Sequence, residues 1–342
     1  MATVKRLPSA APAIVYRAFG GPDVLRCENV PVPLPLPGEV LLRHTAIGVN
    51  FSDANARSGT FYRGQREPGA VIPGNEGVGE IVALGDDVHG FKVGDRVAYV
   101  GMGGAFFENT GAYSTYRAVP AARLIHLPEE LGDIEAAGLL MKGLTASGLI
   151  NRFHKPQAGD TVLIHAAASG VGLILCQWAR HLGARVIGTV GSGQKADIAS
   201  KHGCEHPILY RELPLVEEVR KLCPEGVDAV YDGVGKDTLL PSLDCLRSFG
   251  RLINYGNASG APPAIDLLTL SKKGSLSVSR FALGDHVREL DDYHRALNEV
   301  LDLYAAGTIR PLIGTVMPLS EAAAAHRLLE SGKSIGTIVL VP

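Results

Sequence analysis

The sequence predicts an α/β protein of two domains, a parallel sheet with helices on both faces and a smaller antiparallel β-barrel. Three observations lead to this prediction. The chain has 342 residues, more than one compact core usually supports. Its first third is rich in glycine, proline and short alternating apolar runs. Its middle alternates short buried strands with amphipathic helices.

The first third has the pattern of a small antiparallel barrel. Alternating runs such as EVLLRHTAIGV and GVGEIVALG are separated by turn segments such as PLPLPGE and GDDVHGFKVGD. From about Glu135 onward, apolar residues recur at helical spacing, which marks the change of domain.

Strand and helix alternate through the middle of the chain, which predicts βαβ units and a parallel sheet covered on both faces. The patterns after residue 283 do not continue this alternation, so we expect the chain to return to the first domain. The expected domains are therefore 1–138 with 284–342, and 139–283. The expected strands are 162–165, 186–189, 207–210, 229–232, 251–255 and 275–280, and the expected helices are 171–182, 194–201, 215–222 and 238–246.

The composition excludes several classes of protein. Apolar residues make up 46% of the chain, charged residues 20%, and the net charge is −2, which is typical of a globular protein and not of a disordered one. Lysine and arginine are scattered, so nucleic acid is not expected as the main partner. No run approaches the roughly 18 apolar residues of a membrane span, and the five cysteines are far apart. We therefore expect reduced thiols, a cytoplasmic location and no membrane partner.

The segment TVLIHAAASGVG (161–172) has the context of a dinucleotide-binding turn, because a strand runs into a small-residue turn that opens a helix. Ala167, Ser169 and Gly172 stand where the G-x-G-x-x-G fingerprint has glycines. Small residues let the helix N-terminus approach a pyrophosphate, although Ala167 fits only if the turn needs no positive φ there. A plain strand-to-helix turn is the alternative, and the βαβ context favours nucleotide binding.

The second strand of this unit ends without the acidic residue that would bind the ribose of NAD. The segment GTVGSGQK follows, so Gly191, Ser192 and Lys195 offer N–H groups, a hydroxyl and an ammonium to a phosphate of about two negative charges. Tyr210 and Arg211 are expected to close over the adenine and its 2′-phosphate. A solvated lysine at a helix start is the alternative for Lys195, but the missing carboxylate and the glycines favour NADPH as the cofactor.

Nine ordered segments resemble one family over nearly the whole chain. They are GVNFSDANARSG, PGNEGVGEI, KVGDRVAY, LMKGLTA, HAAASGVG, GTVGSGQK, YDGVG, NYGNASG and KGSLSVSR. They resemble the zinc-free NADPH:quinone oxidoreductases, the zeta-crystallin-like branch of the medium-chain dehydrogenase/reductase superfamily. This resemblance implies a Rossmann-type doubly wound parallel sheet domain and a discontinuous GroES-like β-barrel catalytic domain.

The resemblance also bears on metals. In the zinc alcohol dehydrogenases of this superfamily a Cys, a His and a second Cys hold the catalytic metal, and these positions correspond to Asn50, Asn75 and Lys142 here. Amide and ammonium groups do not replace thiolate and imidazole, so no metal site is expected. The implied reaction is hydride transfer to an acceptor that needs no Lewis acid, either a quinone or an alkene conjugated to a carbonyl.

Site residues follow from the same resemblance. Asn50 and Asp53 are expected to line the nicotinamide side of the catalytic site, with turn capping as their alternative role. Asn50, the hydroxyl of Tyr62 or an ordered water is expected to stabilise and protonate the oxyanion that forms. The expected cofactor-binding residues are Lys142, Thr145, Gly170, Val171, Gly191, Ser192, Lys195, Tyr210, Val234, Gly256, Asn257, Ser259, Phe281 and Lys333.

Two departures from the family concern the substrate. Phe61 stands where the family usually has a tyrosine, with Tyr62 next to it, and the segment 100–113 is longer than usual and adds Phe106 and Phe107. The implied function is quinone reduction by NADPH. An enone or alkenal reductase and a nucleotide-binding protein with a structural or RNA-binding role are the alternatives. The expected edge strand SLSVSR predicts a homodimer.

Overall fold

The computed structural model describes residues 7–60, 69–102 and 110–342. The chain divides into two compact units, and each is discontinuous in sequence. The first unit comprises Met1–Met141, Val287–His294 and Ile313–Pro342, and the second comprises Lys142–His286 and Arg295–Leu312.

Residues 295–312 belong to the second unit in this division, although the sequence pattern groups them with the first. Their contacts explain why. Glu299 accepts hydrogen bonds from the Ser147 hydroxyl at 2.7 Å and from the Asn151 amide at 2.8 Å, and the Arg310 N–H donates to Gln177 Oε1 at 2.9 Å. The boundaries of the functional domains stay a prediction.

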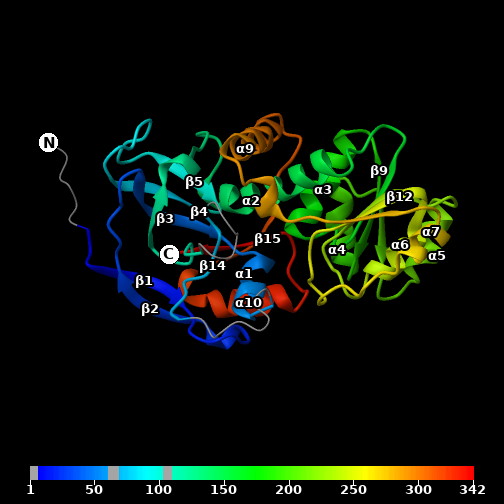
Figure 1. The fold of residues 1–342 in the computed structure, drawn as a ribbon, viewed down its shortest axis with the longest axis horizontal. Coiled ribbons are helices and arrows are strands. Elements are labelled where there is room, and N and C mark those ends of the chain that lie inside the picture. The colour runs from blue at the N-terminus through cyan, green and yellow to red at the C-terminus, as the bar shows by residue number, and fades with distance from the viewer. Residues whose placement is uncertain (1–6, 61–68, 103–109) are drawn as a thin grey trace. The chain divides into compact units, whose positions relative to one another are not determined.

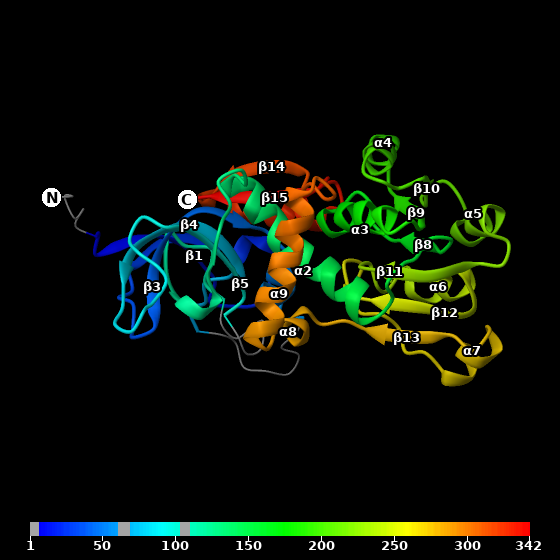
Figure 2. The ribbon, with the colours of Figure 1, turned by 90° about the horizontal axis from the view of Figure 1, so that it is seen from above.

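The second unit is built on a parallel sheet of six strands among the described residues. Its order is β10-β9-β8-β11-β12-β13, which Figure 2 shows from one edge of the sheet to the other. Because the order reverses between β8 and β11, a topological switch point lies at their carboxyl ends, where doubly wound sheets bind ligands. The strands are β8 (Thr161–Ile164), β9 (Arg185–Val190), β10 (His206–Leu209), β11 (Val227–Asp232), β12 (Leu246–Asn254) and β13 (Ser277–Arg280).

The helices of this unit connect the strands as the alternating pattern requires. Residues such as Leu163, Val230 and Leu252 on the strands and Val219 and Leu243 on the helices form one apolar core. The predicted Rossmann-type fold is therefore confirmed. The helices are α3 (Gly170–His181), α4 (Gly193–Lys201), α5 (Leu215–Leu222), α6 (Leu239–Cys245), α7 (Leu267–Lys272) and α8 (Leu283–His286).

The first unit contains a sheet with the order β14-β15-β3-β4-β5-β7, in which β6 also pairs with β3. The red C-terminal strand β15 pairs antiparallel with the blue β3, and β14 pairs with the other edge of β15 (Figure 1). The strands are β3 (Glu39–Gly48), β4 (Glu76–Leu84), β5 (Arg96–Val100), β6 (Tyr116–Pro120), β7 (Ile125–His126), β14 (Ile313–Pro318) and β15 (Thr337–Val341), and β1 (Ala10–Val15) and β2 (Arg26–Pro31) form a separate pair.

Two helices, α1 (Phe51–Arg57) and α10 (Ala322–Glu330), lie within the first unit, while α2 (Asp133–Arg152) and α9 (Leu290–Ala305) contribute residues to both units. Short 3₁₀ turns cover Pro22–Val24, Ala121–Arg123 and Leu319–Glu321. Among the helices that the structure describes, none is both long and apolar enough to cross a bilayer.

Candidate functional site

The turn between β8 and α3 has the geometry of a phosphate-binding turn. Ser169 is the N-cap residue of α3, and its hydroxyl accepts a hydrogen bond from the Gly172 N–H at 3.1 Å. The first N–H groups of a helix have no intrahelical carbonyl partner, so those of Gly170 and Val171 are suited to bind an anion, which the helix dipole also favours.

The same turn explains how the fingerprint tolerates alanine at its first position. The residue with positive φ is Ala166 (φ 51°), and Ala167 has no such requirement. A Cβ at Gly172 would lie 2.3 Å from the Ala166 carbonyl oxygen, so the last glycine of the fingerprint is required for the close packing of helix against turn.

The loop after β9 contains the predicted 2′-phosphate residues. Ser192 caps α4, its hydroxyl accepting from the Lys195 N–H at 3.4 Å. A Cβ at Gly191 would lie 3.6 Å from both the Arg211 Nε and the Tyr210 hydroxyl. The Arg211 guanidinium lies 5.8 Å from the centre of the Tyr210 ring. Burial, and then the charge of Arg211, lower the pKa of Lys195. Arg211 and Tyr210 thus lie beside Gly191, and Lys195 is close enough to Arg211 to be affected by its charge.

Thr189, near the end of β9, is engaged in hydrogen bonds to the turn after β8. Its buried hydroxyl accepts from the Ala166 N–H at 3.2 Å and bonds His165 Nδ1 at 3.0 Å. His165 opens the turn after β8, and its Nε2 bonds the Ser242 hydroxyl at 2.8 Å. Both side chains are buried and hydrogen-bonded to each other, so they have structural roles, and burial lowers the pKa of His165.

The loop after β11 is organised by Asp232, a residue that the sequence analysis did not select. Its Oδ1 accepts hydrogen bonds from the N–H groups of Val234 at 2.8 Å and Gly235 at 3.1 Å, and from the Thr238 hydroxyl at 2.7 Å. Asp232 is buried, and these bonds fix the backbone at the start of the loop. The signal in the sequence was an aspartate directly after an apolar strand, in AVYDGVG.

The loop after β12 lies against the loop after β11. The Ser259 hydroxyl donates to the Val234 carbonyl at 2.9 Å and accepts from the Asp237 N–H at 3.0 Å. A Cβ at Gly256 would lie 2.3 Å from the Gly233 carbonyl oxygen. Asn257 accepts from Arg280 Nη1 at 2.9 Å. The structure therefore brings Val234, Gly256, Asn257 and Ser259 together in one pair of loops.

Three further predicted residues lie elsewhere in the second unit. Lys142 is buried on α2, and Thr145 follows it by one turn and is partly buried. Phe281 follows β13, donates its N–H to the Asn254 carbonyl at 2.9 Å and packs edge-on against Phe153 with 5.8 Å between ring centres. Phe281 thus has a packing role in addition to any role at the cofactor.

In the first unit, Asn50 and Asp53 are joined at the start of α1. The Asn50 N–H donates to Asp53 Oδ2 at 2.9 Å, so the turn-capping role expected as the alternative is present. Asp53 is fully buried and also accepts from the Asn75 amide at 3.0 Å and from the Tyr113 hydroxyl at 3.2 Å. Asp53 therefore organises the residues around Asn50.

Tyr62 and Lys333 are the remaining residues expected near the substrate and the cofactor. Tyr62 lies outside the described residues, as do Phe61, Phe106 and Phe107. Lys333 is exposed after α10, where its N–H donates to the Ser331 hydroxyl at 3.2 Å.

The donor groups at the positions that hold the catalytic metal in the zinc alcohol dehydrogenases do not suit zinc. Asn50 and Asn75 direct their amide Nδ2 toward carboxylates, Glu76 Oε1 at 2.9 Å and Asp53 Oδ1 at 3.0 Å. Across residues 7–60, 69–102 and 110–342 no group of three or more His, Cys, Asp or Glu side chains is arranged to hold a metal.

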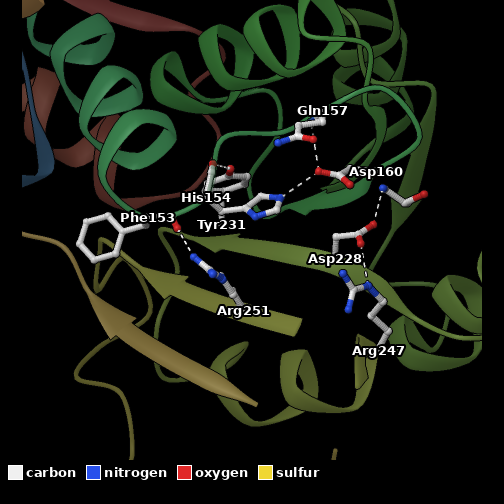
Figure 3. Close-up of polar contacts among 9 residues, drawn as sticks. Phe153, His154, Gln157, Asp160, Asp228, Tyr231, Arg247 and Arg251 are labelled. Atoms are coloured by element: carbon white, nitrogen blue, oxygen red, sulfur yellow. Dashed lines mark hydrogen bonds and ion pairs between the residues drawn. The ribbon is translucent and has the colours of Figure 1, made fainter. Parts of the chain in front are cut away.

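A polar network at the opposite end of the second unit's sheet is structural (Figure 3). Asp228, at the start of β11, accepts from the Thr161 N–H at 2.7 Å and from Arg247 Nε at 2.6 Å. His154 Nε2 lies 3.3 Å from Asp160 Oδ2, and burial lowers the pKa of His154. These groups lie at the amino ends of the strands, away from the switch point at the carboxyl ends.

Comparison with known proteins covers both units. Residues 36–129 match the family model of the alcohol dehydrogenase GroES-like domain, and residues 170–302 match that of the zinc-binding dehydrogenases. A 2-haloacrylate reductase of a Burkholderia species is 42% identical over 96% of this chain and 98% of its own length. A quinone oxidoreductase of Pseudomonas aeruginosa is 40% identical over 97% and 100%. The crystal structure of Escherichia coli quinone oxidoreductase complexed with NADPH has a TM-score of 0.90 and 37% identity, covering 97% of this chain and 100% of that one.

Proposed function

Since this chain belongs to the quinone oxidoreductases of the medium-chain dehydrogenase/reductase superfamily, we propose that it reduces quinones with NADPH and without a metal. Bound NADPH supplies the hydride, that is, the two electrons that the acceptor gains. The chain's own residues bind this cofactor, orient the acceptor and deliver the single proton that the reaction consumes.

The observation that supports the choice of NADPH is the cationic pair of Lys195 and Arg211, with Arg211 and Tyr210 beside Gly191. These two cations suit a 2′-phosphate, and β9 ends without the acidic residue that binds an unmodified ribose. The N–H groups of Gly170 and Val171 would hold the pyrophosphate at the start of α3.

The nicotinamide half is assigned to the loops after β11 and β12. Val234, Gly256, Asn257 and Ser259 would contact it, since these loops lie on the far side of the switch point from Lys195. The remaining proposed contacts are Lys142, Thr145, Ser192, Phe281 and Lys333, and the proposed residues at the acceptor are Asn50, Asp53 and Tyr62.

Metal independence rests on the chemistry of the donors. Amides that donate to carboxylates, and a lysine ammonium, offer no thiolate or imidazole to zinc. Elemental analysis of the purified protein tests this directly, and stoichiometric zinc would contradict it.

A homodimer in the cytoplasm is the proposed state of the protein. β13 is the edge of the second unit's sheet among the described residues, and its free side can pair with the same strand of a second copy. Light scattering after gel filtration measures the mass, and a monomer at micromolar concentration would contradict the proposal.

A second function is favoured by one relative. The 2-haloacrylate reductase is 42% identical to this chain, and its name describes reduction of an alkene conjugated to a carboxylate. The fold and cofactor would be the same for both activities.

A substrate screen with NADPH separates the two functions. The test compares initial rates for 1,4-benzoquinone, 9,10-phenanthrenequinone, 2-chloroacrylate and a simple alkenal. We expect the quinones to give the highest kcat/KM. A preference for 2-chloroacrylate or the alkenal would favour the alkene reductase function over the quinone reductase function. If NADPH is oxidised with none of the acceptors, both proposed functions are contradicted.

A further inference from the structure

Both hydrogens of the Asn50 side-chain amide are engaged inside the first unit. Asn50 Nδ2 lies 2.9 Å from Glu76 Oε1 and 3.3 Å from the Gly48 carbonyl oxygen. A carboxylate and a carbonyl only accept hydrogen bonds, so both neighbours require the NH₂ group and exclude the amide oxygen. The orientation of Asn50 is therefore dictated by its partners.

Glu76 is itself held firmly. Its side chain is buried, and its second oxygen accepts from the Met141 N–H at 3.1 Å. A Cβ at Gly48 would lie 2.1 Å from Glu76 Oε1, so the carboxylate packs directly against the backbone of β3. Because both oxygens have fixed donors, Glu76 cannot turn without losing a buried hydrogen bond.

The Asn50 oxygen is the only group of this side chain left for a bound molecule. The capping box of α1 uses one of its lone pairs for the Asp53 N–H. An amide oxygen has two lone pairs, so one remains. Asn50 is thus a hydrogen-bond acceptor, whereas stabilising an oxyanion, the role considered for it from the sequence, requires a donor.

We propose that Glu76 is a positioning residue that presents Asn50 as an acceptor, and that Asn50 Oδ1 holds the water that protonates the reduced quinone. This inference rests on the proposed function. The acceptor gains two electrons with the hydride and is left with a negative oxygen. One hydrogen of the water bonds Asn50, the other is transferred as a proton to that oxygen, and the hydroxide takes a proton from solvent.

Glu76→Gln tests the inference because it reverses the polarity of Asn50 at nearly constant volume. The glutamine oxygen would accept from the fixed Met141 N–H, which turns the glutamine NH₂ toward Asn50. Asn50 must then rotate and present its own NH₂ to the site. We expect kcat for quinone reduction to fall by at least about tenfold, since proton transfer contributes roughly 10²–10⁴ in rate, while KM for NADPH changes by less than about twofold.

A double-mutant cycle separates positioning from a structural effect. If Glu76 acts through Asn50, Glu76→Gln adds little to the loss already caused by Asn50→Ala. If Glu76→Gln lowers kcat by the same factor in the unaltered protein and in Asn50→Ala, the inference is overturned. Glu80→Gln is the matched control, because Glu80 is on the same strand but pairs with Arg43 at the surface. The kcat of the Glu80→Gln variant should be unchanged.

A second measurement does not depend on turnover. In protein labelled with ¹⁵N at asparagine amides, the Asn50 NH₂ signals are assigned by their loss in Asn50→Ala. We expect both hydrogens to be protected from solvent exchange in the unaltered protein and exposed in Glu76→Gln. Rapid exchange in the unaltered protein would overturn the orientation itself, whereas protected amides without any quinone turnover would refute only the proposed function.

Discussion

Lys195 is the residue on which the choice of cofactor most depends. It lies partly buried at the start of α4, close enough to Arg211 for that charge to lower its pKa. Like charges repel, so a phosphate bound beside these two cations would be attracted by both of them. We therefore propose that the pair discriminates by charge between the two nicotinamide coenzymes.

Lys195→Ala should raise KM for NADPH by about 10- to 100-fold, the effect of losing one charge-assisted bond to phosphate. KM for NADH should change little, because NADH lacks the 2′-phosphate. The measurement is steady-state kinetics with both coenzymes. Lys201→Ala, at the exposed end of the same helix, is the control and should alter neither value.

Other important residues were harder to find, because Glu76 had no local signal and the signal of Asp232 did not show which groups it binds. Lys195 was found because a missing carboxylate and a glycine-rich loop are local features. Asp232 and Glu76 act through partners from several segments, such as the Asn254 amide and the Met141 N–H. A single sequence does not reveal those pairings, because they form only when distant elements pack.

At the scale of elements, the β8–α3 turn is the most constrained. Ala166 adopts a φ of 51°, which costs a residue with a side chain roughly 1 kcal/mol. Its carbonyl oxygen also closes the space around Gly172. The turn is thus held by backbone packing, which places the first N–H groups of α3 where an anion can bind them.

Gly172→Ala should destabilise the second unit by about 2 kcal/mol, since the new Cβ meets backbone that must shift. The midpoint of denaturant unfolding measures this. Gly193→Ala is the control at the start of α4, where nothing lies within 4 Å of the added Cβ, and it should be neutral or slightly stabilising. Equal midpoints for the two variants would contradict the packing described for the turn.

Elements were predicted well where the pattern is periodic. The structure has the six predicted strands of the parallel sheet, though β12 begins at Leu246, before the expected residue 251. α7 was not predicted, because its LLTLSK segment is short and two of its leucines, Leu267 and Leu268, are exposed. Its N-cap, Asp266, accepts from the Leu268 N–H at 3.1 Å, a local bond that apolar periodicity does not register.

At the scale of the whole molecule, buried neutral histidines set the response to acid. In the first unit His44 donates from Nδ1 to the Ser114 carbonyl at 2.7 Å. His326 accepts from Arg57 at 3.3 Å, so it donates from Nε2 to the Tyr113 hydroxyl at 3.0 Å. Burial lowers the pKa of His44 to about 4 and that of His326 to about 3.

Stability of the first unit should therefore fall as the pH drops from 6.5 to 5. In the unfolded chain these two histidines take up protons below the ordinary histidine pKa of about 6.5, whereas in the folded chain their pKa values are about 4 and about 3, so protonation favours unfolding. Each of the two histidines should cost about 1.5 kcal/mol over this interval. Denaturant titrations at several pH values measure the slope, and His326→Gln should reduce it by about half. A slope that is unchanged in this variant would contradict the assignment.

From the sequence alone came the fold class, the positions along the chain of the six strands of the parallel sheet and the cationic loop after β9. These depend on periodicity and on neighbours along the chain, which a single sequence records directly. Only the tertiary structure decided that Ala166 takes the positive φ, that Asp232 ties the loop after β11, and that Glu76 turns the Asn50 amide. Each of these depends on a donor or a close contact outside the local pattern, and hydrogen-bond direction becomes fixed only when both partners are in place.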